Sequence, residues 1–149
     1  MPNRELTTST RYVQLTEPQT RNAAFRSAYV DLQGWDAVDF LVEWGDTTAA
    51  AAEGLQPTLM EDDGAGLPTA IATYSNVAAA DRTGAFPFLT DNLVAGNAVV
   101  GYRGSRRYVH VNFPLTVAFA AGVIGVTAIL RKFGRQPSNT VAVTTGDVA

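Results

Sequence analysis

The octapeptide Ala37-Val38-Asp39-Phe40-Leu41-Val42-Glu43-Trp44 decides the fold class of this chain. Val38, Phe40, Val42 and Trp44 fall on one side of an extended backbone, and Asp39 and Glu43 fall on the other. A helix would scatter the same apolar groups around its axis. The octapeptide therefore predicts a β-strand with one buried and one wet face, which ends at Gly45-Asp46.

The residues before this strand repeat the alternation. Within 29–33, Val30 and Leu32 point one way and their neighbours the other. The sequence Gln33-Gly34-Trp35-Asp36 predicts a turn, because Gly tolerates a positive φ and Asp can close an Asx-turn. We expect the two strands that flank Gly34 to pair as a hairpin.

Residues 113–130 form an uncharged run long enough for a membrane-span candidate. Pro114 lies at its start and Gly122 and Gly125 interrupt it, while the alternation continues upstream through polar residues. The run is better interpreted as two strands, 107–117 and 123–132, joined near 119–122 as a second hairpin. The first residues also lack the apolar stretch of a secretory signal, so we expect neither a membrane span nor general export.

Shorter candidate strands fill the middle of the chain, at 55–61, 70–77, 86–89 and 98–102. Pro57 favours an edge position for the first of them, and 47–54 is either one helical turn or a loop. About eight strands without an ordinary helix predict an all-β antiparallel sandwich or barrel. The residues expected inside are Val38, Phe40, Val42, Trp44, Val109, Val111, Phe113, Ile124, Val126 and Leu130.

The chain of 149 residues is long enough for one domain with a real core. Both ends lack the turn-and-core pattern of the middle. We therefore expect an N-terminal arm over 1–12, a sandwich over 13–133 and a C-terminal arm over 134–149. The alternating Val and Thr residues of 140–144 suit strand addition to a neighbour.

Composition excludes several functions. There is no Cys, which rules out disulfides, thiolate metal sites and thiol nucleophiles. The net charge of −3 argues against general nucleic-acid binding. The one histidine, His110, shares a predicted strand face with Tyr108 and Asn112 and is interpreted as a surface or interface residue. Glu61-Asp62-Asp63-Gly64 lacks calcium-loop spacing and is interpreted as an acidic turn. We expect no catalytic site, metal or cofactor, and hence no enzyme.

Positive charge gathers late in the chain. Arg103, Arg106 and Arg107, with Arg131, Lys132 and Arg135, make six of the eleven cations, whereas acids dominate 31–63. Such an asymmetry predicts a positive and a negative region that suit self-assembly or docking onto an acidic partner. Solvated turn charges are the alternative interpretation.

Several segments together resemble a family of small structural proteins of tailed-phage and prophage virions. Residues 30–36 fit its D-L-x-G-[YW]-[DE] turn, 99–111 fit its G-Y-x-G-x-x-R-Y-[VL]-R-[VL] hairpin, and 59–64 fit its D-D-G turn. The strand 125–130 and the basic tail after it also fit, so the resemblance spans about 29–137. His110 stands where the family pattern has Arg.

The resemblance implies a jelly-roll sandwich that acts as a capsid decoration (cement) protein on the outer surface of the virion, made in the cytoplasm of a bacterial host. Its implied partners are the major capsid protein and itself, as a homodimer or homotrimer. It leaves a tail or connector location open. The residues expected at these interfaces are Arg103, Arg106, Arg107, Tyr108, His110, Arg135 and Trp35.

A second function class is a carbohydrate-binding or adhesin-like β-sandwich, because sugar sites use exposed aromatic rings. Trp35, at a turn, is the best platform for this class, followed by Tyr29, Tyr74, Tyr102 and Tyr108. A jelly-roll enzyme such as a lyase is the third alternative, which the lack of a convergent acid, base and nucleophile argues against.

Overall fold

The computed structural model describes residues 10–46, 54–63, 74–90, 94–114 and 122–132. Their regular secondary structure consists of strands and one short 3₁₀ turn, Ala79–Asp81. The strands are β1 (Thr10–Arg21), β2 (Phe25–Arg26), β3 (Val30–Asp31), β4 (Ala37–Trp44), β5 (Gly54–Leu55), β6 (Thr58–Asp62), β7 (Ser75–Asn76), β8 (Leu89–Thr90), β9 (Gly96–Tyr102), β10 (Tyr108–Phe113) and β11 (Gly122–Arg131).

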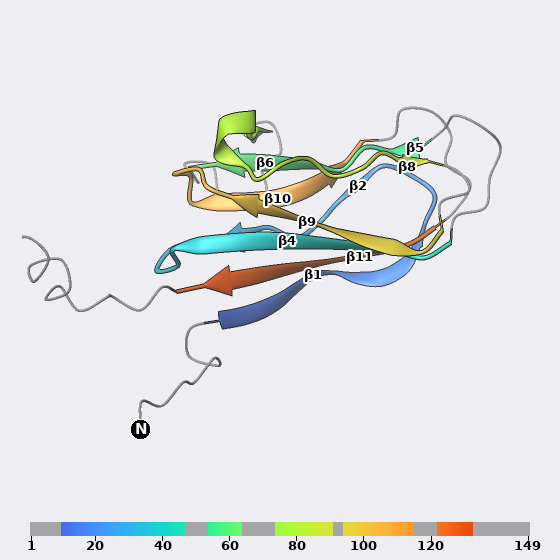
Figure 1. Ribbon diagram of the computed structural model, residues 1–149, viewed down its shortest axis with the longest axis horizontal. Coiled ribbons are helices and arrows are strands. Elements are labelled where there is room, and N and C mark those ends of the chain that lie inside the picture. The colour runs from blue at the N-terminus through green and yellow to red at the C-terminus, as the bar shows by residue number, and fades with distance from the viewer. Residues whose placement is uncertain (1–9, 47–53, 64–73, 91–93, 115–121, 133–149) are drawn as a thin grey trace, which may run out of the picture.

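Two antiparallel sheets form the layers of a sandwich (Figure 1). The first sheet has the order β1-β11-β4-β9. The second has the order β2-β10-β6-β7, with β3 also paired to β10. A small two-stranded sheet, β5-β8, lies at one end.

The strand pairs are nested. β1 pairs with β11, β2 and β3 pair with β10, β4 pairs with β9, and β6 pairs with β7. If β2 and β3 count as one strand and the small β5-β8 pair is left aside, the eight remaining strands form one long antiparallel hairpin. This hairpin is folded over so that its parts enter alternate sheets. This is the double-sheet jelly roll, so the predicted fold class is confirmed.

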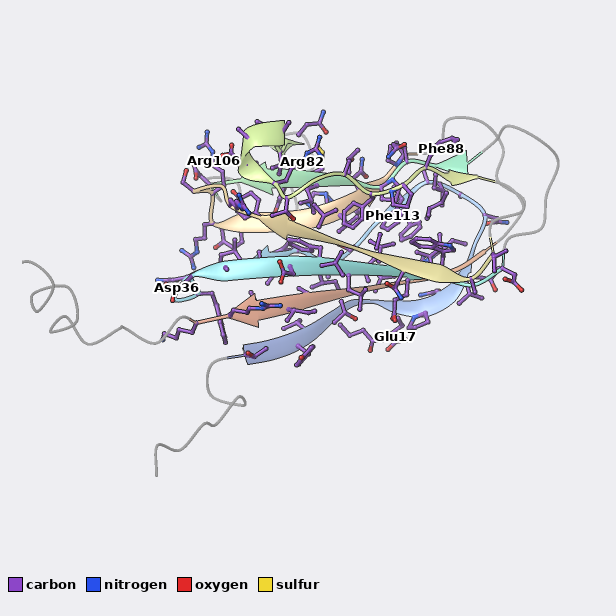
Figure 2. The ribbon with its side chains drawn as sticks, in the orientation of Figure 1. Glu17, Asp36, Arg82, Phe88, Arg106 and Phe113 are labelled. Carbon is purple, nitrogen blue, oxygen red and sulfur yellow. The ribbon has the colours of Figure 1, made fainter. Side chains whose placement is uncertain are left out.

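Inward-facing residues of both sheets make the core, as the alternation predicted. Phe40, Val109, Val111 and Phe113 are completely buried, and of the ten residues expected inside only Trp44 is partly exposed. Its indole nitrogen donates to the Val94 carbonyl at 3.0 Å near the end of the sheet. Figure 2 shows Phe113 between the sheets and the charged side chains of Glu17, Asp36, Arg82 and Arg106 directed outward.

The predicted hairpins are wrong, although their strands exist. β3 pairs with β10 rather than with β4, and β10 and β11 lie in different sheets. The family pattern at 99–111 likewise spans β9 and β10, which belong to opposite sheets. At both of these turns the chain crosses from one sheet to the other, so a local turn signal does not identify the pairing partner.

Two boundaries also differ from expectation. Pro57 falls between β5 and β6, and β6 is an interior strand between β10 and β7, so the predicted edge position is wrong. The N-terminal arm was expected to reach residue 12, yet β1 begins at Thr10 and was not predicted as a strand. The sequence of β1 is polar because most of its side chains are exposed.

Several expectations fall on other parts of the chain. The segment 47–53, most of both terminal arms and Arg135 lie outside the described residues. Among the residues described, no helix has the length and apolar character needed to span a bilayer.

Candidate functional site: an arginine-rimmed end and the adjoining sheet face

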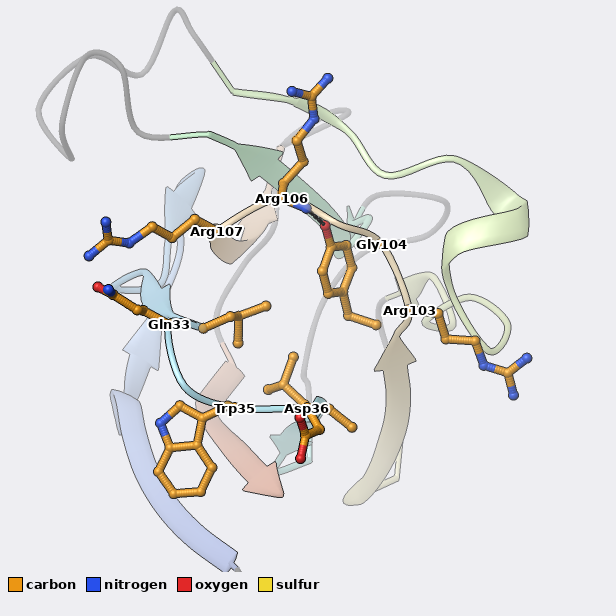
Figure 3. Close-up of a pocket in the computed structure, with 11 residues that line it drawn as sticks. Gln33, Trp35, Asp36, Arg103, Gly104, Arg106 and Arg107 are labelled. Atoms are coloured by element: carbon orange, nitrogen blue, oxygen red, sulfur yellow. Dashed lines mark hydrogen bonds between the residues drawn. The ribbon is translucent and has the colours of Figure 1, made fainter. Parts of the chain in front are cut away.

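Two turns approach each other at one end of the sandwich. Residues 32–36 connect β3 to β4, and residues 103–107 connect β9 to β10. The Leu32 amide donates to the Arg107 carbonyl at 2.8 Å, and the Asp36 amide donates to the Arg131 carbonyl at 3.0 Å. A cavity of about 340 Å³ lies between the turns (Figure 3). We call this region the arginine-rimmed end, because Arg103, Arg106 and Arg107 line its mouth.

The side chain of Tyr102 fixes the second turn. Its hydroxyl donates to the Glu61 carboxylate at 2.6 Å and accepts from the Arg106 amide at 2.9 Å. Gly104 is required beside it, because a Cβ there would lie only 2.3 Å from that hydroxyl. Burial, followed by the bond to Glu61, raises the pKa of Tyr102, so the phenol stays protonated and donates.

The arginines are interleaved with acids. Arg107 makes two hydrogen bonds to the Asp31 carboxylate, at 2.9 and 2.8 Å, and these hold the pKa of Asp31 below its usual value. Arg106 pairs with Asp63, and Arg131 pairs with Asp39 at 2.9 Å. The expected positive and negative regions are therefore not separate, because acids from 31–63 pair with these late cations.

Arg103 differs from its neighbours. Its amide donates to the Asp81 carbonyl at 2.7 Å, but its guanidinium makes no ion pair with any described residue. In Figure 3 the side chain points away from the cavity toward solvent. Its five donors remain free for a partner's carboxylate.

The outer face of the first sheet adjoins this end. Tyr12, Ile129 and Asp39 lie side by side across β1, β11 and β4, one row of the sheet inward from the Arg131 row. The next row places Leu41 beside Val99. Tyr12 is 70% exposed and Val99 is 52% exposed. We call the patch of Tyr12, Ile129, Leu41 and Val99 the apolar outer face; Asp39 lies within it and is paired with Arg131. The patch was not predicted, because Tyr12 was assigned to an arm, although the alternation that continues into β1 was a signal for it.

Of the residues predicted for an interface, four lie at the arginine-rimmed end: Arg103, Arg106, Arg107 and Trp35. Trp35 is partly buried against the core. Tyr108 and His110 lie on the outer face of the second sheet and are only 7% and 3% exposed. The expectation of a surface histidine is therefore wrong.

Long-range packing explains the burial of His110. The ring of Tyr74 covers it edge-on at a centroid distance of 4.4 Å. Burial, with a smaller contribution from Arg26, lowers the pKa of His110 to about 4, so the imidazole is neutral near pH 7. Within the described part of the chain, no cluster of three or more His, Asp or Glu residues could hold a metal ion.

Comparisons with known proteins assign no family to this chain. No protein-family model matches the chain, and no curated protein matches it. Among solved structures it is similar to the CBM22-1 xylan-binding domain of Paenibacillus barcinonensis Xyn10C, at 13% identity and a TM-score of 0.41, over 83% of this chain and 87% of that one.

A second similar structure is the CBM22-1-GH10 part of the Clostridium thermocellum xylanase Xyn10B, complexed with xylohexaose. Its identity is 8% and its TM-score is 0.41, over 85% of this chain and 26% of that one.

Proposed function

We propose that this chain is a virion structural protein, a capsid cement protein that binds the assembled shell of major capsid protein and stabilises it. The observation that carries the proposal is the continuity of the arginine-rimmed end with the apolar outer face. Exposed Tyr side chains and Arg side chains are the residues enriched where proteins bind each other. The family resemblance of residues 29–137 supports the same role.

The mechanism is thermodynamic linkage. A protein that binds the assembled shell better than free subunits lowers the free energy of the shell by RT ln(1 + [L]/Kd), about 2.7 kcal/mol per site at a hundredfold excess over Kd. The arginines would supply bidentate contacts to carboxylates of the shell, and the apolar outer face would supply buried area.

Self-association would use the edge of the first sheet. Among the described strands β1 pairs only with β11, so its other side is available. Register irregularities between Gln14 and Gln19, together with Pro18, interrupt the later half of that edge. The regular half, 10–14, is the part we assign to a homodimer or homotrimer contact.

The carbohydrate-binding class has less support as the main function. Trp35, its best platform, packs against the core, and Tyr102 and Tyr108 are buried. A tail or connector location belongs to the same virion class as cement, and the number of copies in a virion distinguishes them. Mass spectrometry of purified virions tests this: hundreds of copies support cement, whereas a few copies support a tail or connector part.

Two matched pairs of variants test the surface on undecorated heads. Arg103→Glu breaks no ion pair between described residues and should weaken binding at least tenfold. Its control Arg26→Glu, an exposed arginine of the second sheet that likewise makes no ion pair with a described residue, should not. Val99→Asp should weaken binding similarly, while Val94→Asp, at a site that is 79% exposed on the loop before β9, should not. Equal binding by all four variants would remove this surface from the proposal, and no binding by the unmodified protein would refute cement.

A further inference from the structure

A second cavity lies on the outer face of the second sheet. It is not part of the surface that we propose to bind the capsid shell. Its volume is about 260 Å³. Arg26 of β2, the segment 27–29 that follows it, His110 of β10 and Tyr74 line it. Ligand sites in proteins are concave, largely aromatic or apolar, and carry a few polar groups that fix orientation.

Tyrosine rings form much of the lining. Tyr29 is 40% exposed and is held edge-on against Tyr108, with ring centroids 5.5 Å apart. Tyr74 is held edge-on against His110. Both rings are thus oriented by a neighbouring ring before any ligand arrives, which lowers the entropy lost on binding.

His110 is a polar group without a hydrogen-bond partner among the described residues. It is 97% removed from solvent yet lines the cavity. Because its imidazole is neutral near pH 7, one ring nitrogen donates a hydrogen bond and the other accepts one. Among the described residues only the Nε of Arg21 is a fully buried side-chain atom without a partner, so His110 is not a buried orphan. A ligand that supplies hydroxyl groups would bond its nitrogens in place of water in the cavity.

Of the other polar side chains that line the cavity, one is already hydrogen-bonded to the backbone and the others are available to a ligand. The Ser27 hydroxyl donates to the Ala28 carbonyl at 2.8 Å and accepts from the Val111 amide at 3.0 Å, so it serves the backbone. The guanidinium of Arg26 has no ion pair with a described residue. Burial raises the pKa of Tyr74, so its phenol remains a donor.

We infer that this cavity binds one pyranose ring of a polysaccharide. The apolar C–H face of the ring would lie on Tyr29 or Tyr74, and its hydroxyls would pair with His110 and Arg26. The cavity is somewhat smaller than sites for drug-sized ligands, which suits a single sugar ring with the polymer running past the opening.

The test is affinity electrophoresis of the full chain in native gels containing xylan, laminarin, dextran or polygalacturonate. The unmodified protein should be retarded by at least one of these, with a Kd on the order of 1 mM. Retardation only in polygalacturonate would assign the site to acidic sugars through Arg26, and retardation in a neutral polymer would assign it to the tyrosine platforms.

Tyr29→Ala and Tyr74→Ala should weaken the retardation about three- to tenfold. Tyr12→Ala is the matched control, since Tyr12 is more exposed but lies on the opposite sheet. No retardation in any of the four gels, or equal loss in the control, overturns the inference. The Tyr29→Ala variant should bind undecorated heads as tightly as the unmodified protein does. A failure of the sugar-binding inference can therefore be distinguished from a failure of the cement proposal.

Discussion

Tyr102→Phe tests whether one hydroxyl group holds the arginine-rimmed end together. The substitution keeps the buried ring and removes the bonds to the Glu61 carboxylate and the Arg106 amide. A hydrogen bond to a charged group contributes about 1.5–3 kcal/mol, and one between neutral groups contributes about 1 kcal/mol. Glu61 is partly exposed and can recover water, which brings the expected loss to about 2–3 kcal/mol of unfolding free energy.

Urea unfolding at pH 7 measures this loss. With a slope of about 2 kcal/mol/M, the midpoint should fall by about 1–1.5 M, and the melting temperature should fall by about 5–10 °C for a chain of this size. Tyr12→Phe is the control, because its ring is 70% exposed and its hydroxyl should contribute nothing measurable. A Tyr102→Phe variant within 0.5 kcal/mol of the unmodified protein would refute the assignment of this hydroxyl as the fixing group.

Three further predictions concern pH and sterics. The pKa of His110 is lowered to about 4 in the folded state, so the imidazole is protonated first in the unfolded chain as the pH falls. This should remove up to about 3 kcal/mol of unfolding free energy between about pH 6.5 and pH 4. His110→Phe should flatten that part of the plot of urea midpoint against pH. The pKa of Asp31 is also lowered in the folded state, so its stabilising pair with Arg107 is present above about pH 4 and lost below it; Asp31→Asn should remove that acid limb of the profile, and an unchanged limb would contradict the pair's role. Gly104→Ala should lower the melting temperature even in a Tyr102→Phe background, because the added Cβ also meets the ring carbons at 2.5 and 2.6 Å, and full rescue by Phe would show that only the hydroxyl is in the way.

The strands and the core could be predicted because both depend on local alternation. Phe40 and Val111 are buried because the pattern around them has period two, and the same pattern placed nine of ten expected residues in the core. Pairing could not be predicted in this way. Gly34 does mark a turn, with φ of 82°, but that turn crosses between sheets instead of closing a hairpin.

The site, too, could be predicted only where it depends on local sequence. The arginines of 103–107 were identified from charge alone, and the turn that carries them is exposed as expected. Their ion pairs join Arg107 to Asp31 and Arg106 to Asp63, which are 76 and 43 positions apart in the chain. The burial of His110 depends on Tyr74 in the same way. Contacts between residues so distant in sequence follow from topology, which no local pattern encodes.

The nested order of the strands has a consequence for how the chain acquires its structure. β11, the last of the described strands, lies between β1 and β4, and Thr10 pairs with Arg131 across 121 positions. The first sheet therefore cannot close until β11 has left the ribosome. Chains dominated by such distant contacts fold in milliseconds to seconds rather than microseconds. During that interval the edges of β1 and β4 that will bind β11 are unpaired. A ribosome stalled before Gly122 would therefore expose two strand edges that are prone to aggregate, and a chaperone that covers them should raise the yield of folded protein.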